Sequence, residues 1–399
     1  MRSLVESRRI RNSVGSIVVV FLCVACSFKD DINHRRIDLD VGGDVDIALD
    51  SLTSGEFVMM TMFESGEETF LIGLDIVFQS VNVYSLSRQA LIKRLFITDE
   101  GPNAMSKIDG MYFHNFDSIF LVHRYPTEMY LVDSSGTVKR KWDTSKPLPH
   151  PYSDYKYLLE VSFFNDQVYF SREDNSLYVQ LFFDVRPSLK AFSMPLVGKY
   201  SLDESVVVTA FCQRPKEFLD LVARNKFYGA LRTNPRFVVL DGSAYVAYPF
   251  EHWLRVYNVS TGEEIDRKEI KSDLVEFFST TSMTYSGQED EYEHHTIEPA
   301  YHNFIYDHYR NVFYRIVKCK QRYKDSNGKK NLYNEASWSL MVLDRSLNVI
   351  GEAVLPEKMF DFTKVFVGKR GIIVKRLAGS NSALKLVRLN LKSESLSTK

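Results

Sequence analysis

Apolar positions in this chain come in short runs from Val45 onward, and turn-forming residues separate each run from the next. Residues 70–74 and 118–122 are largely apolar, whereas residues 80–86 alternate between apolar and polar side chains. Strands of roughly four to eight residues, with a turn signal about every 8–12 residues, are typical of a sandwich, barrel or propeller. The pattern therefore predicts an all-β body.

One order of strands and turns recurs along the body. The segments 115–142, 237–265 and 339–354 each contain an apolar strand that ends in Asp or Asn. A turn rich in Ser, Gly or Asn follows, and then a strand with charged side chains. A weaker copy lies at 158–179, with its turn at 165–166. The repeats indicate one supersecondary unit used several times.

The repeated unit fits a four-stranded propeller blade. Inner strands are buried on both faces and so are apolar, whereas the outer strand is half exposed and carries charge. Radial repetition leaves only short, protected sheet edges. At roughly 45–60 residues per blade, the body predicts an irregular β-propeller with about six to seven blades of about four antiparallel strands.

Three segments interrupt the repeats. Residues 215–225 begin with Pro and place Phe218, Leu221 and Val222 on one face, which predicts a single short helical insertion. Residues 280–300 are polar and acidic, and we expect a long loop there. Residues 322–337 contain a turn that is consistent with a hairpin.

The first 25 residues have the parts of a secretory signal peptide. The basic residues Arg2, Arg8, Arg9 and Arg11 precede the short apolar run 17–25. That run is far below the roughly 20 residues of a membrane-spanning helix. We therefore predict a signal peptide at 1–25, a tether at 26–40 and the propeller at 41–399. A short anchor that is never cleaved is the alternative.

Residues 22–26, Leu-Cys-Val-Ala-Cys, resemble the bacterial lipobox. Cys23 stands where that pattern has Leu, and it is a poorer lipid acceptor itself because Phe21 and Leu22 precede it. The resemblance implies cleavage before Cys26 and attachment of diacylglycerol, with palmitate among the acyl chains, to its sulfur. Two or more acyl chains give stable membrane anchoring. The segment Lys29-Asp30-Asp31 resembles a signal for the outer face of the outer membrane, and a solvated tether with a periplasmic body is the alternative.

Composition and charge limit the classes of partner. Aromatic residues make up 13% of the chain, which favours strands. Without residues 1–25, Lys and Arg number 46 against 50 Asp and Glu, and such a balance argues against nucleic-acid binding. Cys212 and Cys319 are too few for a disulfide framework, and we expect two isolated thiols, with pairing as the alternative.

Two stretches resemble a known family. Residues 99–103, Asp-Glu-Gly-Pro-Asn, resemble the Gly-Pro entry to a blade in six-bladed propeller lipoproteins. Residues 301–315 resemble the signature of an uncharacterised bacterial lipoprotein family of that kind, a domain of unknown function from the Gram-negative envelope. The resemblance implies a propeller in the cell envelope and carries no activity.

The signature stretch also holds candidate ligand contacts. Tyr306, Asp307, Arg310 and Arg315 could bind a carboxylate or a phosphate, because guanidinium groups recognise both. The alternative is a hairpin turn with a structural Asp–Arg pair.

Other chemistry is weaker. His294 and His295, with acidic neighbours and His302, have no ordered ligand spacing, so we expect a solvated loop without metal. The three tryptophans could stack on sugars, but packing between blades is the favoured interpretation. They are Trp142, Trp253 and Trp338.

No nucleophile elbow, zinc-binding helix or phosphate loop occurs in the chain. The favoured hypothesis is a monomeric, lipid-anchored envelope protein that uses no cofactor and binds a protein or a glycan without catalysis. The alternative is a glycoside hydrolase or lyase acting on polysaccharide. Several carboxylates about 5–10 Å apart in the channel would favour that enzyme.

Overall fold

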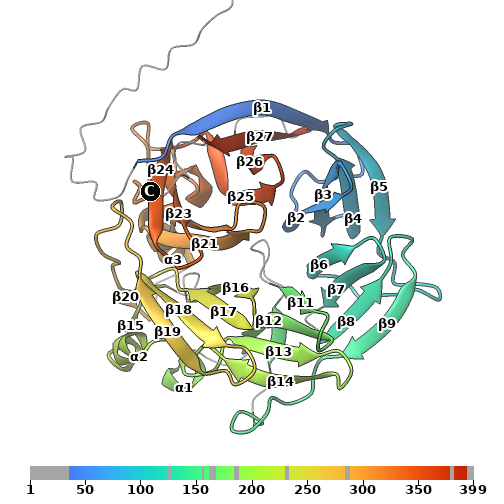
Figure 1. Cartoon of the computed structure of the whole chain (residues 1–399), viewed down its shortest axis with the longest axis horizontal. Helices are drawn as coiled ribbons and strands as arrows, with labels where there is room; N and C mark the ends of the chain where they lie inside the picture. Colours follow the sequence, from blue (N-terminus) through green and yellow to red (C-terminus); the bar gives the residue numbers. More distant parts are fainter. Residues whose placement is uncertain are drawn as a thin grey trace, which may run out of the picture. The chain divides into compact units, whose positions relative to one another are not determined.

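The computed structural model describes residues 36–123, 127–154, 157–160, 168–183, 188–229, 233–283, 288–377 and 382–392. The predicted signal peptide and Cys26 lie outside these residues, as does the turn at 165–166. In the described part, six antiparallel sheets stand around a common centre, with one further two-stranded sheet beside them (Figure 1). The structure thus confirms the predicted propeller and sets the blade number at six.

The first three blades follow one another along the chain, each from its inner strand outward. Blade 3 has its inner position divided between two short strands, which both pair with β12. The strands are β2 (Met59–Ser65), β3 (Glu68–Asp75), β4 (Ser80–Ser85) and β5 (Ala90–Phe96) in blade 1; β6 (Gly110–Asn115), β7 (Ser118–His123), β8 (Glu128–Val132) and β9 (Val138–Asp143) in blade 2; and β10 (Leu158–Glu160), β11 (Tyr169–Ser171), β12 (Ser176–Phe182), β13 (Val197–Ser201) and β14 (Val206–Phe211) in blade 3.

Blades 4 and 5 repeat this order, and blade 6 takes its outer strand from the other end of the chain. The strands are β16 (Arg236–Leu240), β17 (Ser243–Ala247), β18 (Trp253–Asn258) and β19 (Glu264–Glu269) in blade 4; β21 (Ala300–Asp307), β22 (Val312–Lys318), β23 (Trp338–Leu343) and β24 (Val349–Leu355) in blade 5; and β25 (Phe360–Gly368), β26 (Gly371–Arg376), β27 (Ala383–Leu391) and β1 (Leu39–Ala48) in blade 6.

The strand β1 closes the ring. It pairs antiparallel with β27 from Leu39 opposite Leu391 to Ala48 opposite Ala383, and Figure 1 shows it outside the last strands of the chain. Just before it, the Ile37 N–H donates to the Glu352 carbonyl at 3.1 Å. The N-terminal strand therefore covers an edge that blade 6 would otherwise expose.

Burial explains the sequence of each strand. All six residues of β4 are buried, and so are all six of β23, because blades pack against both faces of these strands. The outer strand β19 is almost wholly exposed and consists of Glu, Ile, Asp, Arg, Lys and Glu. The contrast between fully buried strands inside a blade and a charged, exposed outer strand agrees with the prediction.

The recurring Asp or Asn of the sequence repeat forms turns. In Asp133, Asn258 and Asp344, the side-chain Oδ1 accepts the backbone N–H two residues ahead, at 2.8, 2.8 and 2.9 Å respectively. These bonds hold the link between third and fourth strands as Asx turns. The repeat is therefore a signature of chain reversal.

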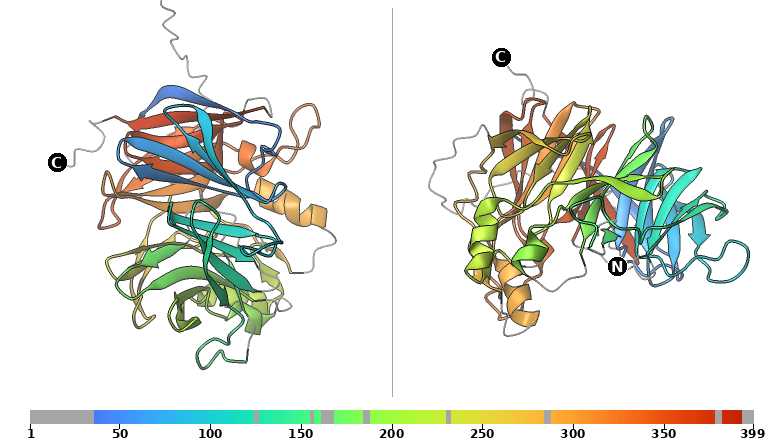
Figure 2. Two further views of the ribbon diagram at one scale, coloured as in Figure 1. Left: turned by 90° about the vertical axis from the view of Figure 1, so that its right-hand side faces the viewer. Right: turned by 90° about the horizontal axis from the view of Figure 1, so that it is seen from below.

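The ring has two faces with different connections. The turns between first and second strands and between third and fourth strands lie on one side, which we call the turn face. The links between second and third strands and between blades lie on the other, the insertion face. It carries α1 (Leu189–Phe192), α2 (Lys216–Ala223), α3 (Gln288–Ile297), the 3-10 helix η2 (Tyr333–Glu335) and the pair β15 (Lys226–Phe227) with β20 (Thr281–Ser282). Figure 2 shows the three α-helices on one side.

The insertions agree with the sequence in two places and differ in one. The helix expected within 215–225 is α2, and a turn at Gly328 brings Lys324 opposite Lys330. The loop expected at 280–300 is wrong for residues 288–297, which form α3. With α1, the described residues thus contain two α-helices besides the single predicted one. Three acidic residues in its first turn and two His in its last suit the helix dipole. No helix among the described residues is long and apolar enough to cross a membrane.

Candidate functional site

Asp307 ends the inner strand of blade 5 and is fully buried. Its Oδ1 accepts the backbone N–H groups of Tyr309 and Arg310, at 2.9 and 3.0 Å. Its Oδ2 accepts Nη1 of Arg310 at 2.6 Å and the hydroxyl of Tyr314 at 2.7 Å. Burial and this carboxylate raise the pKa of the Tyr314 hydroxyl. Asp307 therefore has four donors from its own hairpin.

This hairpin extends over two further blades on the turn face. Arg310 also donates to the carbonyls of Gly368 and Lys369 in blade 6, at 3.2 and 3.3 Å. The Tyr309 hydroxyl donates to Oε2 of Glu64 in blade 1 at 2.7 Å, and the Lys369 N–H donates to Oε1 of the same Glu64 at 2.7 Å. We call Glu64, Asp307, Tyr309, Arg310 and Lys369 the three-blade clasp, because they join blades 5, 6 and 1.

The other two residues of the predicted ligand site lie apart from the Asp307–Arg310 pair. Tyr306 donates to Asn311 at 2.7 Å, and the guanidinium carbon of Arg345 lies 5.4 Å from its ring centroid. Arg315 is fully buried and faces blade 4. The structure gives each of the four residues partners within the chain, and their contact with a ligand stays a prediction.

Arg315 joins blades 4 and 5. Its guanidinium donates to the carbonyls of Glu251, His252 and Ile270, at 2.8, 3.1 and 2.5 Å. Its carbon lies 3.3 Å from the ring centroid of Tyr301. Burial lowers the pKa of Arg315 to about 10, so the group stays charged at neutral pH.

A second group of polar residues lies on the inner strands of blades 4 to 6 and on the 3-10 helix η2, and it was not predicted from the sequence. We call Arg236, His302, Tyr333, Asp361 and Lys364 the inner-strand cluster. Arg236 Nε donates to the His302 carbonyl at 2.9 Å, and His302 Nδ1 lies 3.0 Å from the Tyr333 hydroxyl. A lysine and an aspartate within the apolar strand 360–368 were the available signal.

Positive charge dominates around this cluster. Burial holds the pKa of His302 well below its ordinary range, and Arg236, His295, Lys364 and Lys318 lower it further. Burial also lowers the pKa of Lys364 from 10.5 to about 8, which Asp361 opposes. The inner strands thus hold an amine partly withdrawn from water beside a neutral imidazole.

Other candidates from the sequence have ordinary surroundings. The His295 ring stacks on Tyr333 with centroids 4.0 Å apart. Among the described residues, no three His, Cys, Asp or Glu side chains are placed to hold a metal ion. Trp142 and Trp338 are buried, as expected for tryptophans that pack between blades. Trp253 is 37% exposed, so packing between blades does not explain its position.

The thiols of the body are free within the described part of the chain. Burial raises the pKa of Cys212 to about 12 and that of Cys319 to about 11. Thiols of that kind are poor nucleophiles, because the thiolate is the reactive form.

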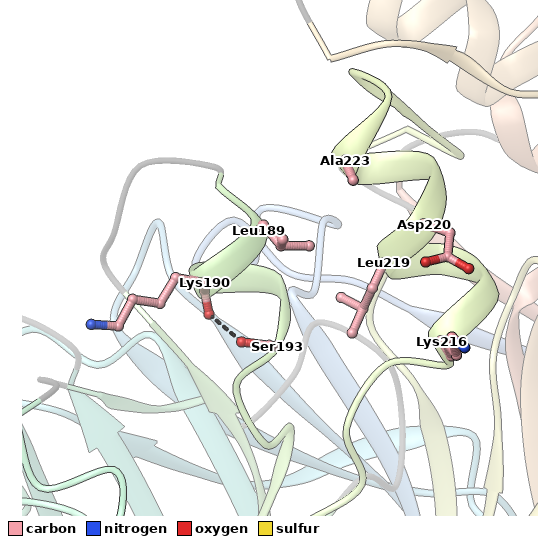
Figure 3. Close-up of a pocket in the computed structure, with 7 residues that line it drawn as sticks. All are labelled: Leu189, Lys190, Ser193, Lys216, Leu219, Asp220 and Ala223. Atoms are coloured by element: carbon pink, nitrogen blue, oxygen red, sulfur yellow. Dashed lines mark hydrogen bonds between the residues drawn. The ribbon is translucent and has the colours of Figure 1, made fainter.

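An open groove of about 590 Å³ lies between α1 and α2 on the insertion face (Figure 3). Leu189 and Leu219 lie on its facing sides, with Lys190 and Lys216 near its rim. It has more apolar than polar lining and contains one acidic residue, Asp220. Nothing at this groove resembles a catalytic arrangement.

Six radial sheets with an N-terminal closing strand define a six-bladed β-propeller. Within that class, the chain belongs to the family described as domain of unknown function DUF4221, which matches residues 43–354. The expected family resemblance is thereby confirmed.

Two solved structures show the same fold. A DUF4221 member from Bacteroides vulgatus is 15% identical, with a TM-score of 0.72 over 90% of this chain and 99% of that one. A Bacteroides fragilis chain that is named as an exported protein is 8% identical, with a TM-score of 0.52 over 89% of this chain and 96% of that one. No curated protein matches the sequence.

Proposed function

We propose that this chain is an exported lipoprotein, held in the outer membrane through lipid on Cys26, whose propeller binds a ligand without catalysing its conversion. The leader supports export, since a basic segment, a short apolar run and Ala25 precede Cys26. The Bacteroides fragilis relative, named as an exported protein, agrees with that destination.

The carboxylates on the inner strands favour binding over hydrolysis. A glycosidase needs two carboxyl groups that are available to the substrate. The inner-strand carboxylates whose side chains the structure describes are Glu64, Asp307 and Asp361, and each accepts hydrogen bonds from the chain itself. Cations outnumber acids in the inner-strand cluster, and such a site suits retention of an anionic partner.

The anchor is tested by metabolic labelling with an alkyne analogue of palmitate in a Bacteroides host. We expect label on the wild-type chain and recovery with membranes, whereas Cys26→Ala should lose the label and leave the membrane fraction. Cys23→Ala is the matched control and should keep both properties. Unchanged label on Cys26→Ala would end the lipoprotein proposal.

The binding role is tested with the purified mature chain and a panel of neutral and acidic polysaccharides. We expect retention of at least one polysaccharide without release of new reducing ends. New reducing ends, or new unsaturated ends, would contradict the binding role and favour the hydrolase or lyase.

A further inference from the structure

The groove between α1 and α2 has walls that are mostly apolar. Leu189 of α1 and Leu219 of α2 face each other across it, and Ala223 continues the wall of α2 (Figure 3). Leu189 is 49% exposed, although covering such a side chain is favourable. Phe218 and Val222, on the opposite face of α2, are buried. The two helices thus leave an open apolar groove of about 590 Å³ on the insertion face.

Buried contacts between the two helices hold this groove at a fixed width. Phe192 of α1 and Phe218 of α2 form an edge-to-face pair with ring centroids 5.4 Å apart. The guanidinium carbon of Arg214 lies 4.9 Å from the Phe192 centroid and 5.8 Å from the Phe218 centroid. Its Nη1 donates to the Phe192 carbonyl at 3.2 Å. The groove is therefore formed before a partner binds, which lowers the entropic cost of binding.

Arg214 also brings a buried positive charge to the contact between the helices. Its side chain is only 8% exposed, and burial lowers its pKa to about 10, so it stays charged at neutral pH. Its Nε has no hydrogen-bond partner, and no carboxylate among the described residues pairs with it. A buried charge without a counter-ion is costly and poorly screened, so an anion nearby is favourable.

The charges at the rim of the groove are mostly positive too. Lys190 and Lys216 lie on its two sides, and Asp220 is the one acid among the described residues that line it. Glu217 also lies in the first turn of α2. It faces the neighbouring blade, where burial raises the pKa of Glu251 and Glu217 raises it further. With the buried arginine, three cations accompany one carboxylate at the groove.

We propose that this groove docks an amphipathic segment of a protein partner. A leucine or phenylalanine of the segment lies between the two helices, and its glutamates or aspartates face Lys190 and Lys216. Helices with apolar anchors three or four residues apart bind grooves of this kind. A small molecule fits less well, because its sites enclose most of the ligand. The groove goes beyond the proposed retention of polysaccharide and is independent of it.

The test uses the purified mature chain, with carbon-13 in its leucine methyl groups, and three synthetic peptides of roughly 15 residues. The first peptide carries leucines on one helical face between glutamates. The second has lysines in place of the glutamates, and the third has serines in place of the leucines. We expect the first peptide to shift the methyl resonances of Leu189 and to bind about tenfold more tightly than either of the others. Its affinity should fall as salt rises.

Two variants at exposed positions separate the apolar contribution from the charged one. Leu189→Ser should keep the fold and weaken binding of the first peptide by about fivefold. Lys216→Glu should weaken the glutamate peptide and strengthen the lysine peptide, because it reverses one charge at the rim. Ile265→Ser and Lys107→Glu are matched controls at exposed positions outside the groove, and they should bind like wild type.

Failure of the glutamate peptide to shift the Leu189 methyl groups, or equal affinity for the glutamate and lysine peptides, would overturn the proposal. A shift that grows with protein concentration in the absence of peptide would assign the groove to a second copy of the chain instead. A shift caused by phosphatidylglycerol vesicles but not by the peptide would assign it to a lipid surface. Polysaccharide retention is measured separately, so the proposed binding function can stand when this groove fails.

Discussion

Single buried side chains decide how neighbouring blades hold together. Arg315 gives three hydrogen bonds to carbonyls of blade 4 while fully buried. The three-blade clasp does the same for blades 5, 6 and 1 around Asp307. The ring therefore depends on polar side chains at its joints as well as on apolar packing.

Replacement of Arg315 tests this claim. Arg315→Met leaves buried carbonyls without donors, so the free energy of unfolding should fall by about 3 kcal/mol or more. Arg345→Met is the matched control, because Arg345 also lies over a tyrosine ring but pairs with the exposed Asp241. Its cost should stay below about 1 kcal/mol. Equal losses in urea denaturation would contradict the assigned role of Arg315.

We expect the half-buried His252 to lower the free energy of unfolding in mild acid. Its Nδ1 lies 2.7 Å from the Tyr301 hydroxyl, and burial, with Arg315 and Lys271, lowers its pKa from 6.5 to about 4. The unfolded chain therefore binds a proton first, so this contribution is complete above pH 6.5 and is lost as pH falls toward 4.

Urea denaturation across that range measures the effect. The stability advantage of wild type over His252→Gln should narrow between pH 6.5 and 4. His308→Gln, at an exposed turn position, should parallel wild type. A constant difference between wild type and His252→Gln would contradict the assignment.

At the residue scale the sequence indicated the types of group but not their partners. The Asp307–Arg310 pair is local, so three residues of separation were enough to suggest it. The partners of Arg315 lie 45 to 64 residues away in the chain, and no local pattern encodes such contacts. Lys364 was missed for the same reason, because its surroundings come from several blades.

Blades were predictable as elements because their pattern is local. Apolar strands alternate with Asx turns, and both signals lie within a few residues of each other. The helix α3 was missed because its polar sequence has no apolar stripe, although charges at its ends suit a helix. The closing strand β1 shows Val41, Val45 and Ile47 alternating with aspartates, but its pairing with β27 spans almost the whole chain.

Removal of β1 tests the closure of the ring. A chain that begins at residue 49 would expose the edge of β27, so it should aggregate or unfold less cooperatively than a chain that begins at residue 33. Size-exclusion chromatography and thermal unfolding by circular dichroism measure both properties. Equal behaviour of the two chains would show that β1 is dispensable for the ring.

The whole molecule combines a leader that predicts export with a six-bladed ring. Each blade buries its apolar strands against its neighbours, and the strand that closes the ring begins at Leu39, within the last residues of the predicted tether. The proposed lipid anchor and the proposed binding role would thus belong to the same chain, and each can be tested independently of the other. Under the proposed function, the lipid on Cys26 would determine where the propeller acts.

The N-terminus of the mature protein tests the central claim most directly. Mass spectrometry of the N-terminal peptide, from the protein expressed in a Bacteroides host and isolated with its membranes, identifies both the cleavage point and the modification. We predict a peptide that begins at Cys26 and carries diacylglycerol on its sulfur. A peptide that begins elsewhere, or an unmodified Cys26, would contradict the account.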